Sequence, residues 1–498
     1  MPSPSEQRFS SRWVLLLSVL GIAVGTGNIW RFPRIAAANG GEDGAGAFLI
    51  AWLVFLLMWS IPLIIAEYAL GQRGRMGVVG TFARTAGRKF GWMGGFVGLV
   101  ATAIMCYYAV VAGWCFYYTA TSFGQGLPVS TEAAMQTWDG FQVSGWRFIV
   151  HAMAMFGGAA ACWWGVRSIE KVNAVLVPTL LIIVVIAVVR AVTLPGAGAG
   201  LAYLFTPTWS DLGNANLWLE ALTQNAWDTG AGWGLILTYA AYMKREHGVV
   251  RNAVLTGVGN NVVSLLAATM IFATVFSVLG GQQAMASGDV LDVMRSSGPA
   301  GTGLTFIWMP QLFAQMPMGN ALAGLFFLAL SFAALSSLIS MIELASRTLV
   351  DFGMTRRKAV ASVAFGGLLL GLPSVVNLDF FANQDFVWGV ALMISGAFVA
   401  FAAVRYGTDR LRQEIRTPQD WPLPKGWGYV LLFLVPLQAA VLLGWWLWLS
   451  ATAYAPETWY NPFDPYSVAT CVVQWGIALA ALIAANRWMV RKSLPAGT

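Results

Sequence analysis

Residues 21–28 read Gly-Ile-Ala-Val-Gly-Thr-Gly-Asn, with three glycines in seven residues near the middle of an apolar run. Residues 228–234 read Asp-Thr-Gly-Ala-Gly-Trp-Gly, with three glycines in five residues of a second apolar run. Each glycine costs about 1 kcal/mol of helix propensity relative to alanine. We therefore predict that two apolar helices open at these stretches.

The composition indicates that the apolar runs lie in a membrane. Of the 498 residues, 58% are hydrophobic and only 10% are charged, and the mean hydropathy is +0.66. Soluble globular chains are about a quarter charged, so soluble, disordered, collagen-like and coiled-coil classes are excluded. The four cysteines lie inside apolar runs, which argues against a disulfide framework. With two histidines and no nucleophile elbow or phosphate-binding loop, the chain is not expected to be an enzyme.

The apolar runs are long enough to form a bundle of spanning helices, because a span needs about 20 mostly apolar residues. Twelve such runs, numbered here as segments 1 to 12, lie near residues 13–38, 46–71, 92–123, 147–165, 172–194, 216–243, 250–280, 318–351, 358–373, 383–406, 428–453 and 466–489. Residues 281–315 are too polar to span and are expected to form a structured outer loop. The predicted fold class is an all-α integral membrane protein with about 12 transmembrane helices.

The basic residues predict the orientation in the lipid bilayer, because cytoplasmic loops collect Lys and Arg. With a cytoplasmic N-terminus, all but five of the 29 Lys and Arg lie at or near the inner face. The exceptions are Arg31, Arg34, Arg147, Arg190 and Arg295. Both termini are therefore expected in the cytoplasm, and the net charge of +7 requires no nucleic-acid partner. The short tails favour a bacterial cytoplasmic (inner) membrane.

The two glycine-rich stretches occupy corresponding positions in two halves of the chain. Segments 1 and 6 each begin a possible repeat of five helices, over residues 13–194 and 216–406, and residues 428–489 add two more helices. Interrupted helices in corresponding positions point to a transporter binding site. Asn28 and Asp228 put a polar side chain suited to a cation into each stretch. Close helix packing through small residues is the alternative, and no sequence identity between the halves supports the repeat.

Several motifs then identify a family. Residues 27–33 read Gly-Asn-Ile-Trp-Arg-Phe-Pro, and the run resembles the signature of the neurotransmitter:sodium symporter family. Further matching pieces follow in the expected order over residues 8 to about 400, at Asn39-Gly40-Gly41, Gly46-Ala47-Phe48-Leu49, Ile61-Pro62-Leu63, Tyr107-Tyr108, Thr238-Tyr239-Ala240-Ala241-Tyr242 and Leu335-Ser336-Ser337. The resemblance implies one transporter domain over residues 1–498 with a LeuT-like 5+5 inverted repeat and discontinuous helices 1 and 6. It also implies sodium-coupled symport by alternating access.

The resemblance implies two sodium sites and no organic cofactor. Sodium is a hard cation and prefers oxygen ligands. The first site would use the carbonyl of Ala23 and the side chains of Asn28, Asp228 and Asn260. The second would use the carbonyls of Gly21, Val24 and Ala333 and the hydroxyls of Ser336 and Ser337. The alternative for the two serines is a hydrogen bond back to their own helix.

Gly25 indicates the substrate class within this resemblance. Amine carriers of the family have Asp at the matching position, where it replaces the carboxylate that their substrates lack. Glycine leaves the half-helix N-terminus free for a substrate carboxylate, with Tyr108 as a hydroxyl donor. The implied substrate-binding residues are Ala23, Gly25, Thr26, Gly27, Ile104, Tyr108, Trp227, Asp228, Gly230, Trp233, Ser337, Leu338 and Met341. Their apolar and aromatic character predicts a neutral amino acid with a hydrophobic or aromatic side chain.

Asp228 departs from the family pattern, in which Ser or Thr stands at this position. Chloride-dependent members bind chloride beside it with residues that match Gln224, Asn260 and Ser264. A carboxylate supplies that negative charge covalently, so we expect sodium coupling without chloride. An isolated charge at mid-bilayer costs on the order of 3 kcal/mol, which makes sodium the expected partner of Asp228. Two alternatives stay open: Asp228 takes up a proton for coupling, or the chain is a sensor of the same fold.

The resemblance also implies two gates. Arg31 and Asp385 match an extracellular gate, and Arg8 and Asp351, with Tyr242, match a cytoplasmic gate. The alternative for such Arg–Asp pairs is an ordinary surface ion pair. Glu67 is expected to accept hydrogen bonds from the opened backbone of segment 1. The sequence leaves the oligomeric state open between monomer and homodimer.

Overall fold

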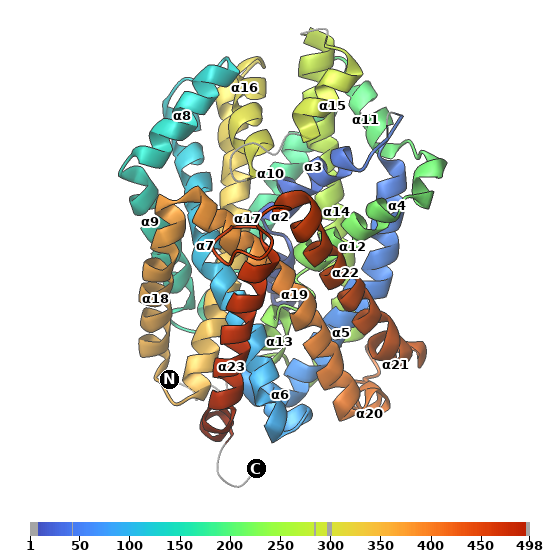
Figure 1. The fold of residues 1–498 in the computed structure, drawn as a ribbon, viewed down its shortest axis with the longest axis vertical. Coiled ribbons are helices and arrows are strands. Elements are labelled where there is room, and N and C mark those ends of the chain that lie inside the picture. Colours follow the sequence, from blue (N-terminus) through green and yellow to red (C-terminus); the bar gives the residue numbers. More distant parts are fainter. Residues whose placement is uncertain (1–7, 42, 283–284, 296–300, 495–498) are drawn as a thin grey trace.

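The computed structural model describes residues 8–41, 43–282, 285–295 and 301–494. All regular elements in these ranges are helices, and most of them run along the long axis of one bundle (Figure 1). The predicted all-α fold class is therefore confirmed. In Figure 1, α6 (Val78–Thr85) and α20 (Thr408–Glu414) lie at the lower end of the bundle. We call this the inner end and the opposite one the outer end.

Nine runs of helix in the described ranges are long and apolar enough to cross a membrane. They contain α4 with α5 (Gly46–Phe55 and Ile61–Gly74), α7 (Gly91–Gly124), α10 (Val166–Val192), α14 (Val250–Val275), α17 (Gly319–Asp351), α18 (Arg356–Val376), α19 (Leu378–Tyr406), α22 (Val435–Leu449) and α23 (Val468–Ser493). The bent segment 1 makes a tenth span. Segment 4 is α9 (Trp146–Cys162), which at 17 residues is shorter, and segment 6 is divided. The described residues therefore contain nine or ten spans of sufficient length, against the twelve predicted.

Segment 1 is interrupted where the first glycine-rich stretch predicts. It consists of α1 (Arg12–Ala23), α2 (Thr26–Ile29) and α3 (Arg31–Ala38). Val24 leaves the helix with φ −80° and ψ 88°, and Gly25 is extended with φ −107° and ψ −171°. The chain bends by 62° between α1 and the outer half. The interruption is short, so carbonyls at the end of α1 and amides at the start of α2 face the same space.

Segment 6 is interrupted over a longer stretch. Its first half, α12 (Ala215–Asp228), and its second half, α13 (Leu235–Ala240), are separated by residues 229–234. Gly230, Gly232 and Gly234 have φ values of 69°, 87° and 77°. Only glycine adopts this left-handed region without a steric penalty. A Cβ at Gly232 would also lie 2.7 Å from Cα of Gly396 in α19. The predicted opening of this helix is therefore confirmed, and its glycines are required by the backbone path.

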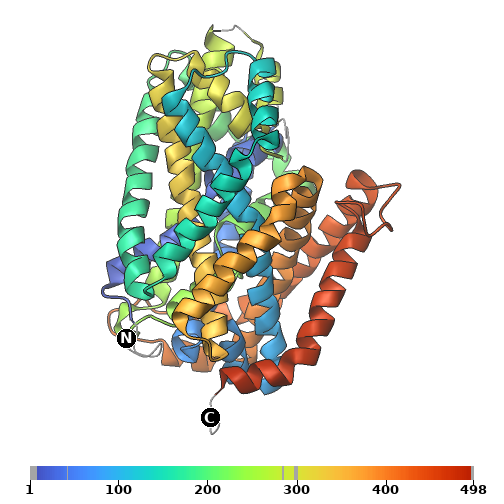
Figure 2. The same cartoon turned by 90° about the vertical axis from the view of Figure 1, so that its left-hand side faces the viewer.

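Shorter helices cover the two ends of the bundle. The outer end carries α8 (Thr131–Val143), α11 (Ala197–Phe205), α15 (Ser287–Arg295) and α16 (Met309–Ala314), and α21 (Gly426–Tyr429) lies towards the inner end (Figure 1). Short helical turns connect several elements, at Leu56–Ser60, Arg88–Phe90, Trp209–Gly213, Arg245–His247, Phe276–Gln282, Leu304–Trp308, Val430–Leu434 and Ser450–Tyr454. Figure 2 shows α23, in red, along one side of the bundle. Most of its apolar surface is exposed, as in a helix that faces lipid.

Candidate substrate and cation site

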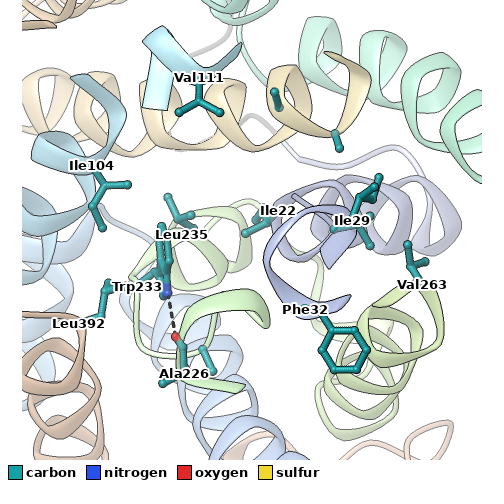
Figure 3. Close-up of a cluster of buried hydrophobic side chains, with 14 of the residues drawn as sticks. Ile22, Ile29, Phe32, Ile104, Val111, Ala226, Trp233, Leu235, Val263 and Leu392 are labelled. Carbon is teal, nitrogen blue, oxygen red and sulfur yellow. Dashed lines mark hydrogen bonds between the residues drawn. The ribbon is translucent and has the colours of Figure 1, made fainter. Parts of the chain in front are cut away.

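A cavity of 560 Å³ lies between the two interruptions and is lined by α1, α2, α7, α12, α17 and α19. All the expected substrate-binding residues line it except Leu338. The side chain of Leu338 points instead towards Gly158 of α9, because it follows Ser337 by one residue and leaves α17 on another face. In Figure 3 Trp233 stands between Ile104 and Ile22, and its indole nitrogen donates to the carbonyl oxygen of Ala226 over 3.3 Å.

The cavity extends beyond the predicted residues towards the outer end. Tyr454 and Tyr466, which are 46% and 40% exposed, line its mouth together with Trp446. These three residues come from the last two spanning segments and the link between them. The sequence analysis missed them because they are ordinary interfacial aromatic residues by sequence, and only the packing of α22 against α19 brings them to the cavity.

The groups expected at the first sodium site meet where the two interruptions face α14. Nδ2 of Asn28 donates to Oδ1 of Asn260 over 2.7 Å and to Oγ of Ser264 over 2.7 Å. The same terminal atom of Asn260 lies 2.9 Å from the carbonyl oxygen of Ala23 and 3.1 Å from that of Asp228. Polar groups of three separate segments therefore converge at one point. Such an oxygen-rich point is the environment that a hard cation prefers.

The carboxylate of Asp228 is buried beside this point. Its Oδ2 accepts hydrogen bonds from Nε2 of Gln224 over 3.2 Å and from Oγ of Ser264 over 3.4 Å. Its Oδ1 is buried and has no hydrogen-bond partner within the described part of the chain. A buried carboxylate oxygen without a donor is costly, so Oδ1 is available to a cation. The described ranges contain no cluster of three or more His, Cys, Asp or Glu that could hold a metal ion.

The groups expected at the second sodium site lie between the end of α1 and the middle of α17. Oγ of Ser337 donates to the carbonyl oxygen of Gly21 over 3.3 Å, which joins the two helices. Oγ of Ser336 donates to the carbonyl oxygen of Ala333 over 3.0 Å, within its own helix. Val24 is buried at the same junction. Ser337 thus makes a bond between helices, whereas Ser336 makes the local bond that was its alternative.

The start of α2 faces a hydroxyl from α7. The backbone N–H and the hydroxyl of Thr26 each donate to the oxygen of Tyr108 over 3.2 Å. A Cβ at Gly25 would lie 3.1 Å from Oγ of Ser337 and 3.2 Å from the Tyr108 oxygen. A longer side chain at position 25 would therefore displace these hydroxyls. Glycine leaves them free to meet an anionic group that enters the cavity.

Glu67 binds the backbone at the second interruption, in segment 6, whereas the prediction placed it at segment 1. Its Oε1 accepts from the backbone N–H of Gly234 over 3.1 Å, and its Oε2 accepts from that of Leu237 over 3.0 Å. The expectation that Glu67 binds segment 1 is therefore wrong. Glu67 lies on α5, which packs against α13, so its carboxylate caps the amides at the start of that half-helix.

The predicted outer gate is not closed in this structure. Nη1 of Arg31 donates to Oε1 of Gln224 over 2.9 Å, and its guanidinium lies 5.1 Å from the ring centre of Trp227. Asp385 also lines the cavity, but the ion pairs among the described residues do not include an Arg31–Asp385 pair. The cavity is accordingly continuous from the interruptions to the exposed tyrosines at its mouth.

Buried polar contacts join the helices at the inner end. Asp351 forms an ion pair of 3.0 Å with Arg347 and accepts from the backbone N–H of Gly77 over 2.5 Å. The hydroxyl of Tyr242 donates to Oε1 of Glu343 over 2.7 Å, and Glu343 pairs with Arg356. The sequence analysis did not identify Arg347 as the partner of Asp351, although its spacing of four residues on a helix is a usual signal for an ion pair.

Comparisons with known proteins agree with this arrangement. A model of the sodium:neurotransmitter symporter family matches residues 6–143 and 141–495. An uncharacterized sodium-dependent transporter of Methanocaldococcus jannaschii is 30% identical over 87% of this chain and 88% of its own length. A sodium- and chloride-dependent GABA transporter of Drosophila melanogaster is 27% identical over 96% of this chain and 54% of its own length. The crystal structure of MhsT in complex with L-phenylalanine has a TM-score of 0.76 and 28% identity, and the match covers 88% of this chain and 99% of that one.

Proposed function

The chain belongs to the sodium:neurotransmitter symporter family, and on that premise we propose that it carries a neutral amino acid with an apolar or aromatic side chain together with sodium and without chloride. Members of the family are transporters, so the chain is a sodium-dependent symporter in a membrane and not an enzyme, as predicted. The positive-inside rule supports, as part of the proposal, an orientation with both termini in the cytoplasm.

The observation that carries the proposal is the convergence of polar groups from three segments at the expected first sodium site. The amide of Asn28 and the carbonyl oxygens of Ala23 and Asp228 all lie within 3.1 Å of one terminal amide atom of Asn260. Asp228 adds a carboxylate oxygen that has no hydrogen-bond donor in the described ranges. A sodium ion bound here would balance that charge and would sit next to the cavity, where it could also meet the substrate carboxylate.

The shape and polarity of the cavity support an amino acid substrate. One end offers the Tyr108 hydroxyl and the start of α2, which suit a carboxylate. The lining also includes Ile104, Trp233 and Met341, which suit an apolar or aromatic side chain. MhsT, which holds L-phenylalanine, has the same fold and supports this substrate class.

The test for the substrate is a sodium-dependent binding screen over the twenty amino acids with the purified full-length protein. We expect phenylalanine, tryptophan, leucine and similar side chains to bind in sodium and not in potassium. Phenethylamine, which is phenylalanine without its carboxylate, serves as the matched control and should not bind. Tighter binding of the amine, or of a charged amino acid, would contradict the proposed substrate class.

The test for transport is uptake and counterflow of the selected amino acid in proteoliposomes. Each sodium ion that crosses 100 mV gains about 2.3 kcal/mol, enough for about fiftyfold accumulation. We expect sodium-driven uptake that is unchanged when gluconate replaces chloride, because Asp228 provides the negative charge. A requirement for chloride would refute that part of the proposal. Binding without counterflow would identify a sensor, and uptake driven by a pH gradient without sodium would identify proton coupling.

A further inference from the structure

At the inner end, the helical turn Arg88–Phe90 is joined to the last turns of α23. Nδ2 of Asn486 donates to the carbonyl oxygen of Arg88 over 3.2 Å, and Oδ1 of Asn486 accepts from the backbone N–H of Trp92 over 2.8 Å. One amide side chain therefore fixes the end of α23 both to the turn and to the start of α7. The lower end of α23 also lies beside α6 and packs against it (Figure 1).

This junction gathers exposed cations from two parts of the chain that are far apart in the sequence. We call them the basic patch, which consists of Arg88, Lys89, Arg487, Arg491 and Lys492. None of the five forms an ion pair within the described part of the chain. No Asp or Glu occurs over residues 68–131 or 465–498, so the two stretches that build the patch supply no negative charge.

Another group of cations at the same end has carboxylate partners. Arg73 and Arg410 pair with Glu414 over 3.3 and 3.1 Å, and Arg412 pairs with Asp409 over 3.1 Å. An accumulation of basic residues at the inner end therefore does not by itself leave their charge unbalanced. The basic patch differs in that the chain provides no such partner for it.

The element that packs beside the patch does not balance its charge either. The ring of Trp488 on α23 lies 5.2 Å, between centres, from the ring of Phe352 at the end of α17. Asp351, the residue before Phe352, is already paired with Arg347 over 3.0 Å. A negative partner for the basic patch must therefore come from outside the chain.

The helix that carries three of the five cations continues into an apolar surface. Ile477 and Ile483 on α23 are 67% and 54% exposed, and Trp488 is 48% exposed. Tryptophan is typical of the level at which lipid headgroups meet the hydrocarbon core. The basic patch therefore lies where headgroups are expected, and the apolar part of α23 lies where acyl chains are expected.

We propose that the basic patch binds an anionic phospholipid, of the class of phosphatidylglycerol, from the leaflet at the inner end. Arginine binds phosphate oxygens through paired hydrogen bonds, and lysine adds a point charge. Clusters of basic residues just beyond the end of a spanning helix attract anionic lipids in this way. The acyl chains lie along the exposed apolar side chains of α23, a contact that a free phosphate ester lacks.

The bound lipid has a consequence for the last helix. The cations of the turn and those of α23 repel one another across the junction that Asn486 holds. A phosphate between them removes that repulsion and stabilises the contact of α23 with the rest of the inner end. A ligand that binds only the folded protein raises its unfolding midpoint, so the lipid should stabilise the whole chain.

The experiment compares the binding of two lipids to the purified full-length protein in detergent. Phosphatidylglycerol and phosphatidylcholine with the same acyl chains are titrated separately, and native mass spectrometry counts the lipids that the protein retains. The parent protein should bind phosphatidylglycerol about tenfold more tightly than phosphatidylcholine, because several cations near one headgroup favour the anionic lipid. Phosphatidylglycerol should also raise the thermal unfolding midpoint more than phosphatidylcholine does.

Neutral substitutions locate the lipid on the protein. Arg491→Gln with Lys492→Gln removes two charges at the end of α23 and should reduce the preference for phosphatidylglycerol. Adding Arg88→Gln and Lys89→Gln should abolish it. All four side chains are exposed, and the double variant is sufficient if the fourfold variant does not fold.

The matched control removes two charges from the other basic group. Arg410→Gln with Arg412→Gln changes the net charge at the same end as much as the double variant does, but these arginines have carboxylate partners. The control should keep the parent's preference for phosphatidylglycerol. An equal loss in the control would show that the overall charge of the inner end attracts the lipid, and the proposal for the basic patch would be wrong.

Two further results would overturn the proposal. One is a parent protein that does not prefer phosphatidylglycerol, and the other is a fourfold variant that keeps the preference. A competition with glycerophosphoglycerol, the headgroup without acyl chains, separates a lipid from a free phosphate ester. An excess of this headgroup should displace little phosphatidylglycerol, and complete displacement would show that the patch binds a free phosphate ester. These measurements need neither sodium nor an amino acid, so their failure leaves the proposed function unchanged.

Discussion

The two interrupted segments provide hydrogen-bond partners for their freed backbone groups in different ways. Segment 1 opens over Val24 and Gly25, and its freed amide at Gly25 is bonded by Oδ1 of Asn28 over 2.8 Å, within the same segment. Segment 6 opens over residues 229–234, and the amides of its second half are bonded by Glu67 from another helix. The freed amide of Gly25 is thus bonded within its own segment, whereas the amides that follow the second interruption are bonded by another helix.

The short and the long interruption contribute different groups to the site. The short interruption keeps the end of α1 and the start of α2 close together, so it offers carbonyls and amides at closely defined positions. The long interruption contributes a charged side chain, Asp228, and the space above Gly230, where a Cβ would meet Ile22 at 3.2 Å. Changes in segment 1 should therefore affect ligand affinity, and changes behind segment 6 should affect the stability of the fold as well.

The largest effect is expected from Asp228→Asn, which removes the charged ligand of the second interruption. Loss of one member of a buried charge pair typically costs about 3 kcal/mol, so sodium affinity should fall more than about a hundredfold. The measurement is the sodium concentration that half-saturates amino acid binding. Asp139→Asn, an exposed carboxylate on α8, is the control and should leave it unchanged. Normal sodium affinity of Asp228→Asn would exclude Asp228 as a ligand.

A smaller effect is expected from Glu67→Gln, which weakens the support behind segment 6. The variant loses the charge of two charge-assisted hydrogen bonds at the start of a half-helix, worth about 2 kcal/mol in total. We expect a lower thermal unfolding midpoint of the purified protein in both sodium and potassium. If only the sodium affinity changed and the midpoint did not, Glu67 would belong to the cation site and the comparison of the two interruptions would fail.

Glycine substitutions compare the two interruptions directly. Gly230 has φ 69°, so Gly230→Ala should destabilise the protein by about 1–2 kcal/mol through left-handed strain. Gly25 has φ −107°, which alanine adopts without strain, but its Cβ would press on the hydroxyls of Tyr108 and Ser337. Gly25→Ala should therefore reduce amino acid affinity with little change in the unfolding midpoint. Equal loss of stability in both variants would contradict this distinction.

The smallest effect is expected from Tyr108→Phe, which removes the hydroxyl at the start of α2. A hydrogen bond of this kind contributes about 1 kcal/mol, so amino acid affinity should fall about fivefold. Tyr118→Phe is a suitable control, because its hydroxyl lies on the same helix and has no hydrogen-bond partner among the described residues. Isothermal titration calorimetry measures the amino acid affinity of both variants. Equal affinities would show that the Tyr108 hydroxyl does not bind the substrate carboxylate.

Helix positions and both interruptions were predictable because they depend on local sequence. Apolar runs of sufficient length have one stable form in lipid, and clustered glycines weaken a helix wherever they stand. Partners between distant segments were harder to predict. Glu67 was expected at segment 1 and binds segment 6. No local pattern distinguishes these two partners of Glu67, since the choice depends on how the helices pack.

By itself, the sequence determined that this chain is a membrane bundle with two opened helices and a carboxylate at one opening. The apolar composition places the helices in the membrane through hydrophobicity, and the glycines open two of them through backbone freedom. Both are properties of short stretches of sequence. Only the tertiary structure decided that Arg31 reaches Gln224 beside the cavity, and that Tyr242 reaches Glu343 at the inner end. These features depend on hydrogen bonds and ion pairs between side chains many residues apart, and such contacts require distances of a few ångströms that only the packed fold defines.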